Sequence, residues 1–110
     1  MTEEVGYLEG LIPIIGRDSA LEILDSSERN AVDAITVLKS ADGTSLEPLK
    51  QQLHILKGIA MNLGLKNAHG MLQREHLLML QEARELAEKI PELFMQELGD
   101  LRTRLQAKDP

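Results

Sequence analysis

The sequence contains no cysteine and no tryptophan, and it has only one phenylalanine and one tyrosine. Without cysteine there is no disulfide, no thiolate zinc site and no cysteine nucleophile. The chain therefore fits a reducing compartment, and we expect a cytoplasmic protein. Because aromatic side chains are scarce, the core must be built from Leu, Ile, Val, Met and Ala, which in this pattern favour helices over strands. These absences predict an all-α fold.

Long apolar runs and an excess of basic charge are also missing. No stretch approaches the roughly 20 apolar residues that a membrane helix needs, and the start, Met1 to Glu4, lacks the basic segment of a signal peptide. The formal net charge is -6 at pH 7, which opposes attachment to nucleic acid or anionic lipid, since both need clusters of Lys and Arg. We expect no nucleic-acid or membrane partner, and a protein or small-molecule partner instead.

The 110 residues leave room for one domain, and we expect residues 1–110 to share a single core. Glycine and proline divide the chain into a weak leader helix and four longer helices. Their expected bounds are about Glu3 to Ile15, Asp18 to Asp42-Gly43, Thr44 or Ser45 to Gly64, Ala68 to about Lys89, and Pro91 to about Ala107. Short connections predict an antiparallel up-down four-helix bundle with the leader as a short N-terminal lid helix.

The helix expected from residue 45 to 64 carries a histidine opposite its apolar stripe. The stripe consists of Leu49, Leu53, Leu56, Ala60 and Leu63. At about 100° per residue, His54 points roughly 120 to 140° away from the centre of that stripe and should meet solvent. Lys50, Lys57 and Gly58 lie on the same outward sector. A glycine inside a helix costs about 1 kcal/mol relative to alanine, so Gly58 needs another explanation, and we interpret it as a gap through which a partner reaches the imidazole.

The run His54-Ile55-Leu56-Lys57-Gly58, followed by Leu63-Gly64, resembles the H-x-L-K-G-x-x-x-x-L-G signature of histidine-containing phosphotransfer (HPt) domains. The resemblance extends over most of the chain, because the expected helices and the acidic turn with glycine follow the order of that family. It implies that His54 is the phosphoacceptor, that Lys57 neutralises phosphate charge and that Gly58 gives access.

The resemblance also implies a function in two-component signalling. HPt domains are phosphorelay intermediates rather than enzymes, and they exchange a phosphoryl group with aspartates of receiver domains in response regulators or hybrid histidine kinases. This chain would then act as a monomeric phosphoprotein that binds no cofactor, with Mg²⁺ held by the partner receiver domain.

Four further residues near His54 are candidates for the site. Gln51 and Asn62 are candidates for a hydrogen bond to the imidazole or to the partner. Met61 is a candidate for docking because methionine adapts to several surfaces. Lys50 lies one turn before His54 and is a candidate for a contact with the partner.

The second half of the chain departs from the family pattern. HPt domains commonly have a Leu-Glu pair where Glu75-His76 stands here, so the inward pattern of that helix is interrupted. His69 and His76 would lie on one helix face about 10.5 Å apart, with no acidic residue four positions after His69. We therefore expect no metal site, and a capping or structural role for these two histidines.

Three other classes of function compete with the relay. A helical adaptor or inhibitor would dock on a kinase or receiver domain through the same helix without being phosphorylated. The dimerisation domain of a histidine kinase fits less well, because it usually has an acidic residue after the histidine, where Ile55 stands here. A self-contained hydrolase or metalloenzyme would need a convergent set of acid, base or ligand residues, which this sequence lacks.

Overall fold

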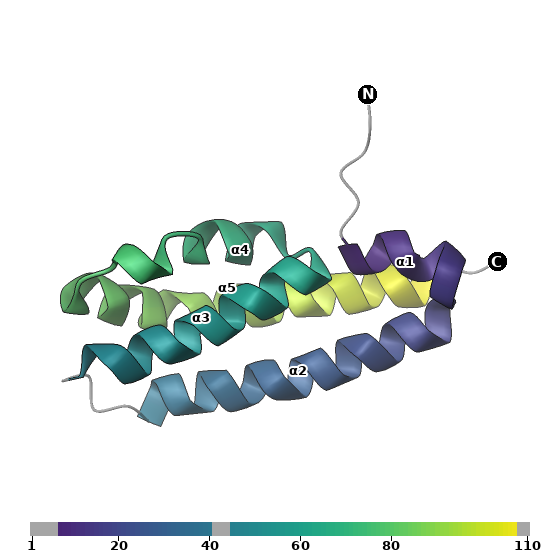
Figure 1. Cartoon of the computed structure of the whole chain (residues 1–110). Coiled ribbons are helices and arrows are strands. Elements are labelled where there is room, and N and C mark those ends of the chain that lie inside the picture. Colours follow the sequence, from purple (N-terminus) through teal and green to yellow (C-terminus); the bar gives the residue numbers. More distant parts are fainter. Residues whose placement is uncertain (1–6, 41–44, 108–110) are drawn as a thin grey trace.

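The protein structure is a computed structural model that describes residues 7–40 and 45–107 (Figure 1). These residues form five α-helices, one short 3₁₀ helix and no strand, which confirms the all-α prediction for this part of the chain. The helices are α1 (Tyr7–Ile15), α2 (Arg17–Ser40), α3 (Leu46–Leu63), α4 (Lys66–Leu72), η1 (Glu75–Leu77) and α5 (Leu80–Ala107).

The three long helices α2, α3 and α5 lie side by side along a molecule of 50 × 30 × 18 Å (Figure 1). Helix α2 packs against both α3 and α5, and α3 packs against α5. Helix α2 runs opposite to α3, and α4 with η1 brings the chain back along α3, so that α5 runs in the same direction as α3. Helix α1 covers one end, where it packs against α2 and α3. None of the described helices is both long and apolar enough to cross a bilayer.

A single apolar core joins all five helices and consists mainly of leucine and alanine. The only phenylalanine, Phe94, is fully buried in it. The apolar stripe predicted for α3 is confirmed, because all five of its residues are at most 2% exposed. Helical spacing also predicts an apolar stripe on α2, consisting of Leu21, Leu24, Ala31, Val32, Ile35 and Leu38. Val32 is 42% exposed, so its place in that stripe is wrong. Burial of the apolar stripe of α3 fixes how this helix is rotated about its own axis.

Two glycines with left-handed backbone conformation mark the ends of α1 and α3. Gly64, with φ 80°, ends α3, and its N–H donates to the carbonyl of Ala60 at 2.9 Å. Gly16, with φ 87°, separates α1 from α2 in the same way. Only glycine adopts this conformation without strain, so both ends are encoded locally. Asp18, whose side chain suits an N-cap at the predicted start of the second helix, lies instead in the first turn of α2.

Two of the predicted boundaries lie outside the described residues. These are the stop signal at Asp42-Gly43, with Thr44 after it, and the first residues of the leader, 3–6.

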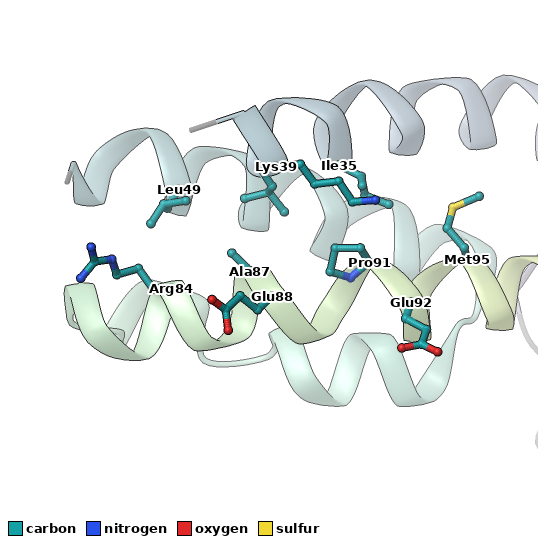
Figure 2. Close-up of a pocket in the computed structure, with 10 residues that line it drawn as sticks. Ile35, Lys39, Leu49, Arg84, Ala87, Glu88, Pro91, Glu92 and Met95 are labelled. Carbon is teal, nitrogen blue, oxygen red and sulfur yellow. The ribbon is translucent and has the colours of Figure 1, made fainter. Parts of the chain in front are cut away.

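The predicted break at Pro91 is wrong. Pro91 lies inside α5, eleven residues after its first residue, and it is buried on the side facing α2 and α3 (Figure 2). Proline cannot donate to the carbonyl four residues earlier, which costs a helix about 3 kcal/mol. The apolar stripe nevertheless continues through it, and burial of that stripe outweighs the loss. The buried residues of α5 are Ala83, Ile90, Pro91, Phe94, Leu98, Leu101 and Leu105.

The break falls earlier, between α4 and α5, so the predicted helix from Ala68 to Lys89 is also wrong. Helix α4 ends at Leu72, and residues 73–79 form a turn, the 3₁₀ helix η1 and an extended link. Helical spacing places Met79 on the apolar stripe of that predicted helix, with Leu72 and Ala83, but Met79 is 70% exposed.

Candidate functional site

His54 stands on the outer face of α3, as predicted. Its side chain is 73% exposed, because the buried stripe of α3 turns it away from the core. The ring nitrogen Nδ1 lies 2.9 Å from Oε1 of Glu75, the first residue of η1. The imidazole is therefore open to a partner on one side and held by a carboxylate on the other.

Glu75 is the one buried charged residue in the described part of the chain, at 4% exposure. Its Oε1 also lies 3.6 Å from Nζ of Lys57. Burial by itself raises the pKa of Glu75, but the hydrogen bond from His54 and the positive charge of Lys57 outweigh it, and the pKa falls below its ordinary value. Glu75 is thus a carboxylate at neutral pH, with no proton to donate.

This carboxylate selects the tautomer of His54. A carboxylate only accepts hydrogen bonds, so Nδ1 of the imidazole carries the proton and donates it to Glu75. In the neutral ring the lone pair is then on Nε2. The nucleophilic nitrogen of His54 is therefore the one that does not contact Glu75.

The two lysines of the predicted site are also bound within the chain. Nζ of Lys57 donates to the carbonyl of Gln73 at 3.3 Å, and Nζ of Lys50 donates to the carbonyl of His76 at 2.8 Å. The side chain of Lys57 is only 23% exposed, so the expectation of a freely exposed lysine is wrong. Both ammonium groups are thus hydrogen bonded to backbone carbonyls of the segment after α4. Helical periodicity in the sequence does not reveal such bonds.

Gly58 has no neighbour that would exclude a side chain. A Cβ atom placed on it would meet no atom within 4 Å, apart from its own helix and chain neighbours. Packing within the chain therefore does not require a glycine there. This agrees with the interpretation that Gly58 keeps space free for something outside the chain.

The remaining predicted residues surround His54 without contacting its ring. Gln51 and Asn62 are exposed, and neither is hydrogen bonded to the imidazole in the described part of the chain. Met61 is 56% exposed and stays available for docking.

The two other histidines are not on one helix. His69 lies in α4 and His76 in η1, so the premise that they share a helix face is wrong. Among the described residues there is no cluster of three or more side chains suited to hold a metal ion.

Glu75 is a residue of the candidate site that helical periodicity did not identify. A signal was present: Glu75 occupies an inward position three residues after Leu72, which is buried. A carboxylate at such a position requires a partner of opposite charge or a hydrogen-bond donor. The outward histidine and lysine of α3 supply both.

The lowered pKa of Glu75 makes a prediction for acid stability. A depressed pKa stabilises the fold fully above the unfolded value of 4.5, and this contribution disappears as the pH falls through the lower folded value. We therefore expect the difference in free energy of unfolding between the wild type and Glu75→Gln to shrink as the pH falls below about 4.5. Urea titrations from pH 7 to pH 3 measure it, with Glu92→Gln on the exposed face of α5 as the control. A difference that stays constant over this range would contradict the assignment.

A separate hollow of about 770 Å³ lies between α2, α3 and α5 (Figure 2). Apolar residues such as Ile35 and Pro91 form part of its lining, together with charged residues such as Lys39 and Glu88. Neither His54 nor any other candidate site residue lines it, and its described lining includes no histidine or hydroxyl group. The hollow is therefore separate from the residues around His54.

No family model, curated protein or solved structure matches the chain.

Proposed function

We propose that this protein is a phosphorelay intermediate that carries a phosphoryl group on Nε2 of His54. The observation that carries the proposal is the pairing of a 73% exposed imidazole with a buried carboxylate at its Nδ1. A surface histidine without a role does not require a buried carboxylate as a partner. The pairing leaves a nucleophilic nitrogen facing outward on a helix whose glycine leaves space for a second protein.

The proposed transfer needs only His54, Glu75 and an aspartyl phosphate on a receiver domain. The Nε2 lone pair attacks phosphorus and forms the N–P bond, while the P–O bond to the aspartate breaks and the aspartate leaves as a carboxylate. The proton on Nδ1 stays in its hydrogen bond with Glu75, so the phosphorylated ring is cationic. The carboxylate 2.9 Å away stabilises this new charge. The Mg²⁺ used in such a transfer belongs to the receiver domain.

The surroundings of His54 suit a protein partner. Ile55 and Met61 on α3 are 44% and 56% exposed and offer apolar contacts beside the imidazole. In this proposal α2, α3, α4 with η1, and α5 form the antiparallel bundle of an HPt domain, and α1 is its lid. The protein acts in two-component signalling in the cytoplasm, as a monomer without a cofactor of its own.

Lys57 is proposed to turn from Gln73 toward the phosphoryl group during transfer, because a cation offsets the developing charge. Lys57→Met removes the ammonium and keeps most of the apolar stem. We expect transfer to slow about tenfold, the equivalent of one charge-assisted hydrogen bond. Rapid-quench kinetics measure it, and Lys39→Met on α2 is the control for the loss of one charge. Transfer rate constants equal to those of the control would remove this role from Lys57.

Gly58→Ala tests access to His54. Alanine is the better helix former and meets nothing in the chain, so we expect the free energy of unfolding to rise by about 0.5–1 kcal/mol. The added methyl group faces the partner, so receiver binding and transfer should weaken at the same time. Gly99→Ala is the matched control, because Gly99 also lies inside a helix with open space around it. If both variants are stabilised and both transfer equally fast, Gly58 has no access role.

The proposal is tested by phosphoryl transfer to the wild-type chain. Receiver domains of the encoding organism are phosphorylated with a small phosphodonor and Mg²⁺ and then mixed with the protein. We expect at least one receiver to produce an acid-labile, base-stable label that maps to Nε2 of His54 by ³¹P and ¹⁵N NMR. If receivers bind without labelling the chain, it is an adaptor instead. If none labels it, the relay proposal fails.

A further inference from the structure

Three side chains of α3 hold the segment between α4 and α5 in an antiparallel register. The segment comprises residues 73–79, and η1 within it packs against α3. The three contacts come from positions 57, 54 and 50, which share one face of α3 over about 10.5 Å. They are Lys57 Nζ to the Gln73 carbonyl at 3.3 Å, His54 Nδ1 to Glu75 Oε1 at 2.9 Å and Lys50 Nζ to the His76 carbonyl at 2.8 Å.

The segment has little structure of its own to position Glu75. Its internal backbone bonds run from the Leu77 N–H to the Arg74 carbonyl at 2.9 Å and from the Leu78 N–H to the Glu75 carbonyl at 3.4 Å. The second bond is long. A 3₁₀ turn of three residues is weakly determined without tertiary contacts. The carbonyls on either side of Glu75 are bound by lysines of α3, so these lysines set where its carboxylate lies.

We infer that Lys50 is a positioning residue for His54 that acts through the His76 carbonyl. Lys50 contacts neither the imidazole nor Glu75 in the described residues. By binding the carbonyl of His76, the residue after Glu75, Lys50 keeps the Glu75 carboxylate next to Nδ1 of His54. The proton therefore stays on that nitrogen. The ammonium of Lys50 is bound within the chain to the His76 carbonyl, whereas the sequence suggested only a contact with the partner.

The positioning role proposed for Lys50 differs from the role of Lys57. Lys57 lies 3.6 Å from the carboxylate, so its removal changes the charge around Glu75 directly. Lys50 acts on the site only through the backbone carbonyl of His76. Its removal therefore changes the position of the Glu75 carboxylate and not the charge beside it. The inference about the ring proton holds without phosphotransfer, and only its consequence for rate rests on the proposed function.

The test is the tautomer of His54 in Lys50→Met. Long-range ¹H–¹⁵N spectra of the isolated chain at pH 8 report which ring nitrogen carries the proton. In the wild type we expect the Nδ1–H form, and in Lys50→Met a shift toward the Nε2–H form or an average of both. Lys50→Arg, which can still donate to the carbonyl, should restore the wild-type spectrum. Lys39→Met should leave it unchanged.

Two outcomes decide the inference. If His54 in folded Lys50→Met keeps the wild-type ring shifts, the positioning role is wrong. If Lys50→Met loses helical circular dichroism, Lys50→Ala replaces it, since alanine favours the helix and has no side-chain donor, and the same shift toward Nε2–H is required.

Transfer kinetics give a second readout that is independent of the first. With a phosphorylated receiver as donor, Lys50→Met should lower kcat about tenfold and leave KM unchanged, because a misplaced Glu75 carboxylate impairs the chemical step. A raised KM with unchanged kcat would mean that Lys50 is a docking residue and would overturn the inference. If no receiver transfers but the tautomer shifts, the positioning role stands and the relay falls.

Discussion

His54→Gln is expected to abolish phosphoryl acceptance and leave the helices unchanged. Glutamine has no nitrogen lone pair that can attack phosphorus, so no N–P bond forms. Its amide can still donate to Glu75, which keeps the buried carboxylate hydrogen bonded. The side chain at this position is 73% exposed, so little packing is lost, and we expect a change in the free energy of unfolding below about 1 kcal/mol. Labelling by a phosphorylated receiver and far-ultraviolet circular dichroism measure both parts.

Matched substitutions at the two other histidines complete this prediction. His69→Gln and His76→Gln should both be labelled like the wild type, because neither ring is bonded to a carboxylate in the described structure. Labelling of His54→Gln at a wild-type rate would refute the phosphocarrier function, whatever its fold. Loss of labelling in His76→Gln alone would move the acceptor to the neighbouring segment and would equally contradict the assignment.

The features that local patterns determine could be predicted from the sequence. The stripe of α3 repeats at helical spacing and ends at a glycine that accepts the left-handed conformation, so the bounds of this helix and the outward direction of His54 follow directly. The all-α class followed in the same way from composition. These inferences needed no knowledge of what packs against what.

The features that tertiary contacts determine could not be predicted in this way. Proline is ordinarily a boundary, yet Pro91 lies within α5 because the stripe on either side of it is buried. The chain breaks instead at residues 73–79, where two lysines of α3 bind backbone carbonyls. Such contacts join positions at least 16 residues apart. No periodic signal reports them.

Glu75 shows how a departure from a pattern can point to a candidate site. A charged residue at an inward position is costly unless it is paired, so its presence points to an unseen partner. Here the partner is the imidazole that the outward pattern of α3 had already identified. Each observation alone is ambiguous, whereas together they define one site.

Glu75→Gln is expected to shift the phosphotransfer equilibrium toward the receiver about ten- to hundredfold. The carboxylate stabilises the cationic phosphoimidazole by a charge-assisted hydrogen bond, worth about 1.5–3 kcal/mol, and about 1.4 kcal/mol corresponds to a factor of ten. Glutamine keeps an oxygen that accepts from Nδ1, so the tautomer of the free ring should persist while the charge is lost. Forward and reverse rate constants with a phosphorylated receiver give the equilibrium constant. Glu92→Gln is the control for removing one carboxylate elsewhere.

The combination of readouts separates charge from geometry at this site. If Glu75→Gln keeps the Nδ1–H tautomer and shifts the equilibrium, the carboxylate acts on the phosphorylated state through its charge, while Lys50 acts on the position of that carboxylate. If the equilibrium constant is unchanged although the tautomer persists, the ring does not gain a positive charge that Glu75 stabilises. In that case the phosphoryl group would have to be carried on a neutral ring, with the proton lost from Nδ1 during transfer, and the hydrogen bond of 2.9 Å would serve only to orient the imidazole.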